Sequence, residues 1–143
     1  MQLILPTEIR QQLEIALRDA GRREIGGILM AEHVADNSFC VRSLTVQRRG
    51  GSFAAFMRAV ESFLSPLRNF FRQTDYDYTK FNYIGEWHSH PAGRSSRPSG
   101  TDLKQIKQLN DAMELDGLPA ISLIVAENDI SLLMAGTRRL ADG

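Results

Sequence analysis

The chain has 143 residues, of which 43% are hydrophobic, and its 17 basic and 17 acidic residues give a formal net charge of zero. The length predicts a single domain over residues 1–143, with a core at about 3–136 and a loose C-terminal tail. Balanced charge without a basic stripe argues against nucleic-acid binding. No apolar run is long enough to cross a bilayer, the N-terminus turns polar too early for a signal peptide, and the single cysteine suits a reducing compartment, so we expect a cytoplasmic protein.

The first 46 residues alternate between helical and strand patterns. Apolar side chains recur at helical spacing between Pro6, which suits a helix start, and Gly21, which suits a helix end. Further on, Gly26 and Gly27 interrupt a strand-like run and indicate a bulge or a close backbone approach. The predicted elements are an edge strand or lead-in at residues 3–5, a helix at 6–21, a strand at 24–30, a turn at 31–37 and a strand at 39–46.

A glycine-rich connector at residues 48–52 leads into the second half of the chain. Phe53 to Phe71 shows helical spacing and is expected to pack against the sheet, with a kink or a break at Pro66. The later predicted elements are a loop at 73–80, a strand at 81–90, a helix at 102–115 with Leu103 and Ile106 facing inward, and a hairpin of strands at 120–126 and 130–136. This order of helices and strands indicates an α/β sandwich with a mixed sheet.

The stretch from Tyr83 to Asp102 carries the strongest chemical signal. Side chains alternate along a strand, so His88 and His90 project to the same side and supply half of a tetrahedral zinc site. A proline and a polar seven-residue loop follow, and then Ser99 is expected to cap the next helix with Asp102 in its first turn. The Asp102 carboxylate can reach back as a third ligand, which leaves one position open for a catalytic water.

Each half of this motif also has an ordinary structural explanation. Two histidines on one strand face are often hydrogen-bonded rim residues, and Ser-x-x-Asp resembles a common capping box. Their combination at a fixed separation favours a metal site. The neighbouring Glu86 is assigned no chemistry, because it is expected on the strand face opposite the ligands, and Trp87 is expected to point into the core.

The arrangement His88-x-His90-Pro91, seven residues, Ser99-x-x-Asp102 resembles the signature of the JAMM (JAB1/MPN/Mov34) metallopeptidases. That signature includes an upstream glutamate before a glycine pair, which Glu24 matches. The amino-acid sequence of residues 23–27 and 85–91 is most similar to that of the small prokaryotic members, and among them to that of deconjugating peptidases of CBASS antiphage operons. The resemblance runs from the first helix to about residue 136 and implies an α+β, cytidine-deaminase-like MPN sandwich with a mixed central sheet flanked by helices.

The resemblance also implies roles for five residues. His88, His90 and Asp102 would bind one Zn²⁺ per chain. Glu24 would act as general base toward water and then as general acid toward the leaving amine. Ser99 would hydrogen-bond the tetrahedral oxyanion, or would only cap its helix. The implied substrate is a ubiquitin-like protein or a conjugated protein partner, cleaved at the amide bond after its C-terminus.

Two alternatives stay open at the level of the sequence. One is a metallohydrolase of the same chemistry that trims a sulfur-carrier-like precursor or cleaves another amide. The other is a non-catalytic MPN scaffold, which would be expected to lose ligands, whereas Glu24, Ser99 and all three expected ligands are present. The sequence carries no signal for the oligomeric state.

Overall fold

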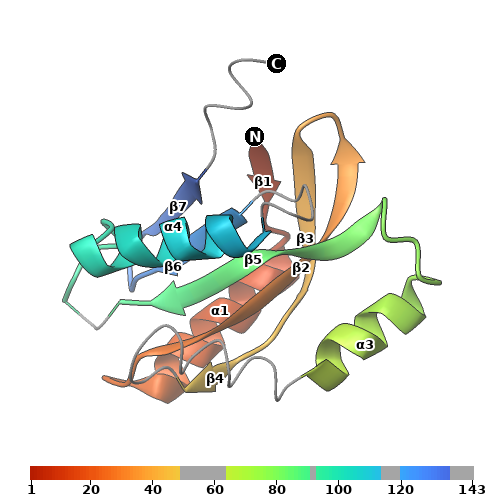
Figure 1. The fold of residues 1–143 in the computed structure, drawn as a ribbon. Coiled ribbons are helices and arrows are strands. Elements are labelled where there is room, and N and C mark those ends of the chain that lie inside the picture. The colour runs from red at the N-terminus through yellow and green to blue at the C-terminus, as the bar shows by residue number, and fades with distance from the viewer. Residues whose placement is uncertain (49–63, 91–92, 114–119, 136–143) are drawn as a thin grey trace.

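The computed structural model describes residues 1–48, 64–90, 93–113 and 120–135 (Figure 1). The elements in these ranges are β1 (Gln2–Ile4), α1 (Thr7–Ala20), β2 (Ile25–Ala35), β3 (Ser38–Leu44), β4 (Gln47–Arg48), α3 (Leu64–Gln73), β5 (Phe81–Ser89), α4 (Gly100–Met113), β6 (Ala120–Val125) and β7 (Ile130–Ala135). The seven described strands form one sheet in the order β1-β3-β2-β5-β6-β7, with β4 also paired to β2.

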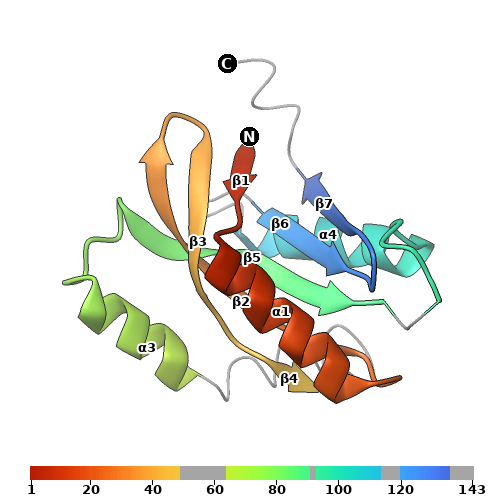
Figure 2. The same ribbon diagram turned by 180° about the vertical axis from the view of Figure 1, so that it is seen from behind.

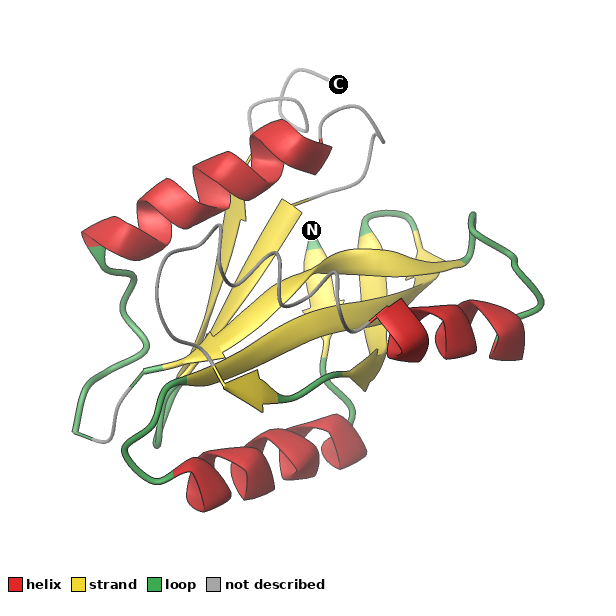
Figure 3. Ribbon diagram, turned by 60° about the horizontal axis from the view of Figure 1, so that its bottom comes forward, coloured by secondary structure: helices red, strands yellow, loops and turns green. Residues whose placement is uncertain are grey.

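Helices cover both faces of this sheet. α1 packs against β2 and β3, α4 packs against β6 and β7, and α3 contacts β5. α4 lies in front of the sheet in Figure 1 and α1 lies in front of it in Figure 2, and Figure 3 shows the two helices on opposite sides. The β1–β3 and β5–β6 pairs are parallel, whereas β2–β3, β2–β5 and β6–β7 are antiparallel. The expected sandwich, a mixed central sheet flanked by helices, is therefore confirmed.

The main hydrophobic core lies between α1 and the sheet. Trp87 is fully buried, and its Nε1–H donates to the carbonyl of Thr45 at 2.8 Å, so its predicted place in the core is confirmed. Truncating a buried tryptophan typically costs about 3–5 kcal/mol, so this side chain anchors β5 firmly. Other buried members of the cluster come from α1, β2, β3 and β6, namely Leu13, Leu29, Val41, Ile121 and Leu123.

The local signals at α1 and at the last hairpin predicted the observed structure. α1 ends where Gly21 adopts a φ of 61° and donates its N–H to the carbonyl of Leu17, a conformation that favours glycine. β6 and β7 pair as the predicted hairpin, with Val125 level with Ile130. Periodicity and turn residues act over a few positions, so such elements can be read directly from the sequence.

β2 differs from the prediction, because it continues to Ala35 instead of ending at Met30. The predicted turn at 31–37 was too long, and only Asp36 and Asn37 turn, Asn37 with a φ of 59°. β2 pairs with β3 on one side and β5 on the other. These ladders hold polar residues such as Glu32 in an extended conformation that their local preference does not indicate.

The two later helices differ in part from their predicted form. Leu103 in α4 is 54% exposed, so its predicted inward orientation was wrong, whereas Ile106 is buried as expected. α4 packs against β6 and β7, and Leu103 lies on the side of the helix that faces solvent. The predicted aromatic helix is described only from Leu64, as α3, which contains Pro66. Its earlier part, from Phe53, and the predicted C-terminal tail lie outside the described residues.

Among the helices that the structure describes, none combines the length and apolar character that crossing a membrane requires.

Candidate metal centre

β5 delivers both histidines to the sheet face that α4 covers. This strand lies between β2 and β6, with His88 level with Gly26 on one side and with Ile124 on the other. His90 follows the end of the strand, and its backbone N–H donates to the carbonyl of Val125 at 3.0 Å. Hydrogen bonds to neighbouring strands thus hold the backbone extended at both histidines. With one residue between them, their side chains lie on the same side.

The start of α4 positions Asp102. The backbone N–H of Asp102 donates to Ser99 Oγ at 3.1 Å, and the backbone N–H of Ser99 donates to Asp102 Oδ2 at 2.8 Å. The N–H of Leu103 donates to the carbonyl of Ser99 at 3.1 Å, which begins the helical hydrogen bonding. Ser99 therefore occupies the predicted N-cap, and the reciprocal bonds of this capping box orient the Asp102 carboxylate toward the sheet.

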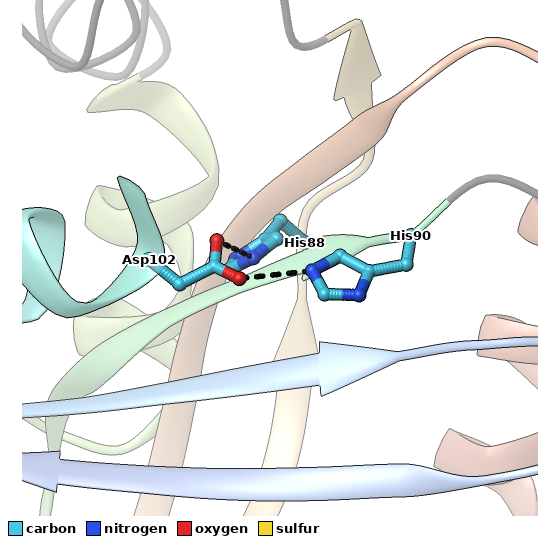
Figure 4. A group of neighbouring side chains, drawn as sticks. All are labelled: His88, His90 and Asp102. Atoms are coloured by element: carbon cyan, nitrogen blue, oxygen red, sulfur yellow. Dashed lines mark hydrogen bonds and ion pairs between the residues drawn. The ribbon is translucent and has the colours of Figure 1, made fainter. Parts of the chain in front are cut away.

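His88, His90 and Asp102 converge on one point (Figure 4). His88 Nε2 lies 2.8 Å from Asp102 Oδ1, and His90 Nε2 lies 2.9 Å from Asp102 Oδ2. One ligand atom from each residue lies within 4.8 Å of the others. The side chains of His88, His90 and Asp102 are only 4%, 9% and 7% exposed. The structure therefore brings the three predicted ligand residues together in a cluster that could hold a metal ion.

Asp102 remains ionised in this cluster. Burial by itself would raise the pKa of Asp102, but its contact with His88 and the hydrogen bond from the backbone N–H of Ser99 outweigh burial and hold that pKa well below its ordinary range. A carboxylate that stays charged near neutral pH is ready to bind a cation.

The hydrogen-bonding capacity of the two rings also fits a cation. His88 faces Glu86 Oε1 with Nδ1, at 3.2 Å, and Asp102 with Nε2. His90 faces the carbonyl of Ser95 with Nδ1, at 2.7 Å, and Asp102 with Nε2. A neutral imidazole has only one N–H, so it cannot donate to oxygens at both nitrogens. If each ring donates its Nδ1–H to the acceptor away from Asp102, both Nε2 lone pairs face the oxygens of the same carboxylate and repel them. A metal ion bound between the two rings and the carboxylate would remove this repulsion.

Glu86 belongs to this site, so the prediction that it lies on the opposite strand face was wrong. Residues two apart on a strand share a face, and Glu86 is two residues before His88, as His90 is two residues after it. Glu86 is 2% exposed, and its Oε1 also accepts a hydrogen bond from the hydroxyl of Ser122 on β6. The same spacing rule that selected the histidines would have identified Glu86.

Glu24 lies at the rim and is not part of the three-residue cluster found among the described residues. It is exposed and directly precedes β2. The register pairs Gly26 with His88, so continuing it by two residues brings Glu24 level with His90. A Cβ atom at Gly26 would lie 2.5 Å from the carbonyl oxygen of Trp87, so the close backbone approach predicted for this glycine is present.

A cavity of about 960 Å³ lies on the α1 side of the sheet, opposite the face that α4 covers, and of the three cluster residues only His90 lines it. It runs between α1 and the β6–β7 hairpin and reaches Ser89 and His90. Its apolar walls include Leu13, Leu17, Leu123 and Val125, and arginine residues of α1 and of the segment that follows it also line it. Neither His88 nor Asp102 lines this cavity.

The family of prokaryotic homologues of the JAB domain matches residues 6–138, and the chain belongs to this family. The predicted relation to small prokaryotic JAMM proteins is thus confirmed. A CD-NTase/cGAS isopeptidase from Enterobacter hormaechei subsp. hoffmannii (strain UCI 50) is 30% identical over 126 residues, which are 86% of this chain and 66% of that protein. The chain thus spans slightly less than two thirds of the length of that relative.

A similar solved structure is the solution structure of protein DSY2949 from Desulfitobacterium hafniense. It matches with a TM-score of 0.59 at 16% identity, over 93% of this chain and 82% of the other. At this identity, the match shows a shared fold.

Proposed function

We propose that this protein is a zinc-dependent isopeptidase. It would hydrolyse the amide bond after the C-terminus of a ubiquitin-like protein or of a conjugated protein partner, in the bacterial cytoplasm and as part of antiphage defence. The observation that carries the proposal is the convergence of His88, His90 and Asp102 at one buried point in a fold of the JAB family. Similarity to a protein named CD-NTase/cGAS isopeptidase supports the bond class and the biological setting.

The ligand set supports zinc as the metal. Two imidazoles and one carboxylate are typical of catalytic zinc sites, which have three protein ligands and one open position. Bound there, zinc would supply Lewis acidity and would lower the pKa of a water from about 15.7 to about 7.

Glu24 would then move the protons. The strand register, continued by two residues, brings Glu24 level with His90 at an exposed position, from which its carboxylate could meet both the attacking water and the amide nitrogen of a substrate. As general base it would accept the proton of the water, and as general acid it would pass a proton to the leaving amine. Loss of this residue should stop hydrolysis without removing the metal ligands.

Ser99 can combine its two predicted roles. Its Oγ accepts the N–H of Asp102, and a hydroxyl that accepts a hydrogen bond still has its own O–H to donate. We assign this O–H to the developing oxyanion of the substrate carbonyl, a contact typically worth about 3 kcal/mol in the transition state. The capping bond fixes where the hydroxyl oxygen lies, so the donor would be in place before the substrate binds.

The test combines zinc analysis with a cleavage assay. We expect close to one zinc per wild-type chain by elemental analysis, and its loss in His88→Ala/His90→Ala. Glu24→Ala should keep the zinc but lose cleavage of a ubiquitin-like fusion by at least 100-fold, in line with general acid–base catalysis of about 10²–10⁴-fold. Glu8→Ala, which removes an exposed glutamate of α1, is the matched control and should cleave normally.

Two results would count against the proposal. If the wild type binds zinc but cleaves no ubiquitin-like fusion, the proposed substrate is overturned, and precursor trimming or hydrolysis of another amide should be tested next. Wild-type protein that binds no zinc after reconstitution would overturn the enzyme and favour a scaffold.

A further inference from the structure

The loop between β5 and α4 is tied to the turn between β6 and β7. Ser96 in this loop is fully buried. Its backbone N–H donates to the carboxylate of Asp129, at 3.2 Å from Oδ1 and 3.1 Å from Oδ2, and its hydroxyl donates to Oδ2 at 2.5 Å. The hydroxyl also lies 2.5 Å from Ser131 Oγ on β7. These bonds join two segments that lie more than thirty residues apart in sequence.

Asp129 is itself held in the hairpin turn. Its carbonyl accepts the N–H of Ala126 at 2.9 Å, which closes the turn between the two strands. Val125 and Ile130 pair directly beside it. The carboxylate therefore extends from a rigid support and can fix the loop against the sheet.

One peptide unit connects this clamp to the metal centre. The N–H of Ser96 and the C=O of Ser95 belong to the same planar peptide group and point in opposite directions. On one side the N–H meets the Asp129 carboxylate, and on the other side the C=O lies 2.7 Å from His90 Nδ1. A chain of hydrogen bonds thus runs from Asp129 through a single amide to a predicted metal ligand.

We propose that Asp129 is a positioning residue for His90, an inference that rests on the metal site of the proposed function. The negative charge on Asp129 polarises the Ser95–Ser96 amide, which makes its carbonyl a stronger acceptor for the Nδ1–H of His90. The proton is thereby held on Nδ1, and the Nε2 lone pair faces the metal. Outer hydrogen-bond partners of this kind typically change metal affinity by about 10- to 100-fold.

The test measures zinc dissociation constants by competition with a chromogenic chelator. Asp129→Ala should weaken zinc binding by about 10- to 100-fold. Asp129→Asn keeps one acceptor oxygen without the charge, so its zinc affinity should fall by less than that of Asp129→Ala. Ser96→Ala removes the hydroxyl but keeps the backbone N–H. If Asp129 acts on His90 through the Ser95–Ser96 amide, the zinc affinity of this variant should stay near that of the wild type. Asp36→Ala, in the turn between β2 and β3, is the matched control and should not change the affinity.

A second readout separates positioning from loss of fold. Nitrogen-15 NMR of the imidazoles should show His90 of the wild type with its proton on Nδ1, and a mixture of the two tautomers in Asp129→Ala. Thermal melting of the metal-free variants reports whether they fold, and if Asp129→Ala does not, Asp129→Asn carries the test.

The outcomes distinguish this inference from the proposed function. Wild-type zinc affinity and an unchanged His90 tautomer in both Asp129 variants would overturn the positioning role and leave the isopeptidase standing. If Asp129→Ala binds zinc more weakly but the wild type cleaves no ubiquitin-like fusion, the positioning role is supported and the proposed substrate is overturned. A wild type that binds no zinc would overturn both.

Discussion

The two histidines of the candidate metal centre are oriented by different acceptors. His88 has the buried carboxylate of Glu86, which the hydroxyl of Ser122 also contacts, whereas His90 has the backbone carbonyl of Ser95. A carboxylate is the stronger acceptor, since hydrogen bonds to ionised groups are roughly twice as strong as neutral ones. His88 is thus oriented by a side chain of its own strand. His90 is oriented by the loop between β5 and α4, which depends on contacts with other segments, such as that with Asp129, for its position.

Substitution of Glu86 tests the first arrangement. Glu86→Ala removes the partner of His88 Nδ1, and we expect zinc to bind about 10- to 100-fold more weakly. Glu86→Gln keeps an acceptor oxygen at the same place, so its loss should be smaller. The measurement is chelator competition, with Glu32→Ala as control, because Glu32 lies on the neighbouring strand and pairs with Arg42 instead. Equal zinc affinity in Glu86→Ala and the wild type would contradict the assignment.

At the level of elements, β2 has two glycines at the site, of which Gly26 lies against β5 and Gly27 lies against Thr45, just after β3. A Cβ atom at Gly26 would lie 2.5 Å from the Trp87 carbonyl oxygen and 3.3 Å from His88 Cβ. At Gly27 it would lie 1.9 Å from the carbonyl oxygen of Thr45. Both obstacles include backbone atoms, which cannot rotate away, so β2 needs glycine here for steric reasons.

Gly26→Ala should therefore lower the free energy of unfolding by about 1–3 kcal/mol, the usual cost of overpacking. It should also weaken zinc binding, because the strands must separate beside His88. Urea denaturation of the metal-free protein measures the first effect and chelator competition the second. Gly100→Ala is the control, since a Cβ there meets nothing within 4 Å and alanine favours the helix. A Gly26→Ala variant as stable as the wild type would contradict the steric explanation.

Across the whole molecule, the candidate metal centre joins parts that are distant in sequence. β5 supplies the histidines, the capping box of α4 supplies Asp102, and the β6–β7 turn holds the intervening loop through Asp129. A ligand that binds only this assembled site stabilises the folded state, by about 4.1 kcal/mol at a free concentration 1,000 times its dissociation constant.

Chelation should consequently lower the melting temperature, and by less at acidic pH. Imidazoles must be neutral to bind zinc, so protons compete with the metal for these ligands and the stabilisation by zinc should be smaller at acidic pH. Asp102 does not add to this loss, because its pKa is held well below the ordinary range and it stays ionised. Melting scans with zinc and with chelator at pH 8 and pH 5 test this, with His88→Ala as the control that should show no zinc-dependent shift. A zinc effect of equal size at both pH values would contradict the ligand set.

The sequence alone determined the features that depend on near neighbours. The side-chain alternation of a strand placed His88 and His90 on one face, and the capping pattern placed Ser99 and Asp102 at the start of a helix. Turn residues and periodicity predicted the bounds of α1 closely, and the family signature pointed to Glu24. The same alternation, applied to Glu86, would have placed it beside His88.

The tertiary structure alone decided the rest, because it depends on which segments become neighbours. Pairing with strands on both sides extended β2 past its predicted end, and the parallel pairing of β5 with β6 brought Ser122 to Glu86. The contact between Ser96 and Asp129 follows from the order of strands in the sheet. No spacing rule connects residues so far apart, since their meeting is set by the summed packing of the sheet and its helices and not by the local preference of either segment.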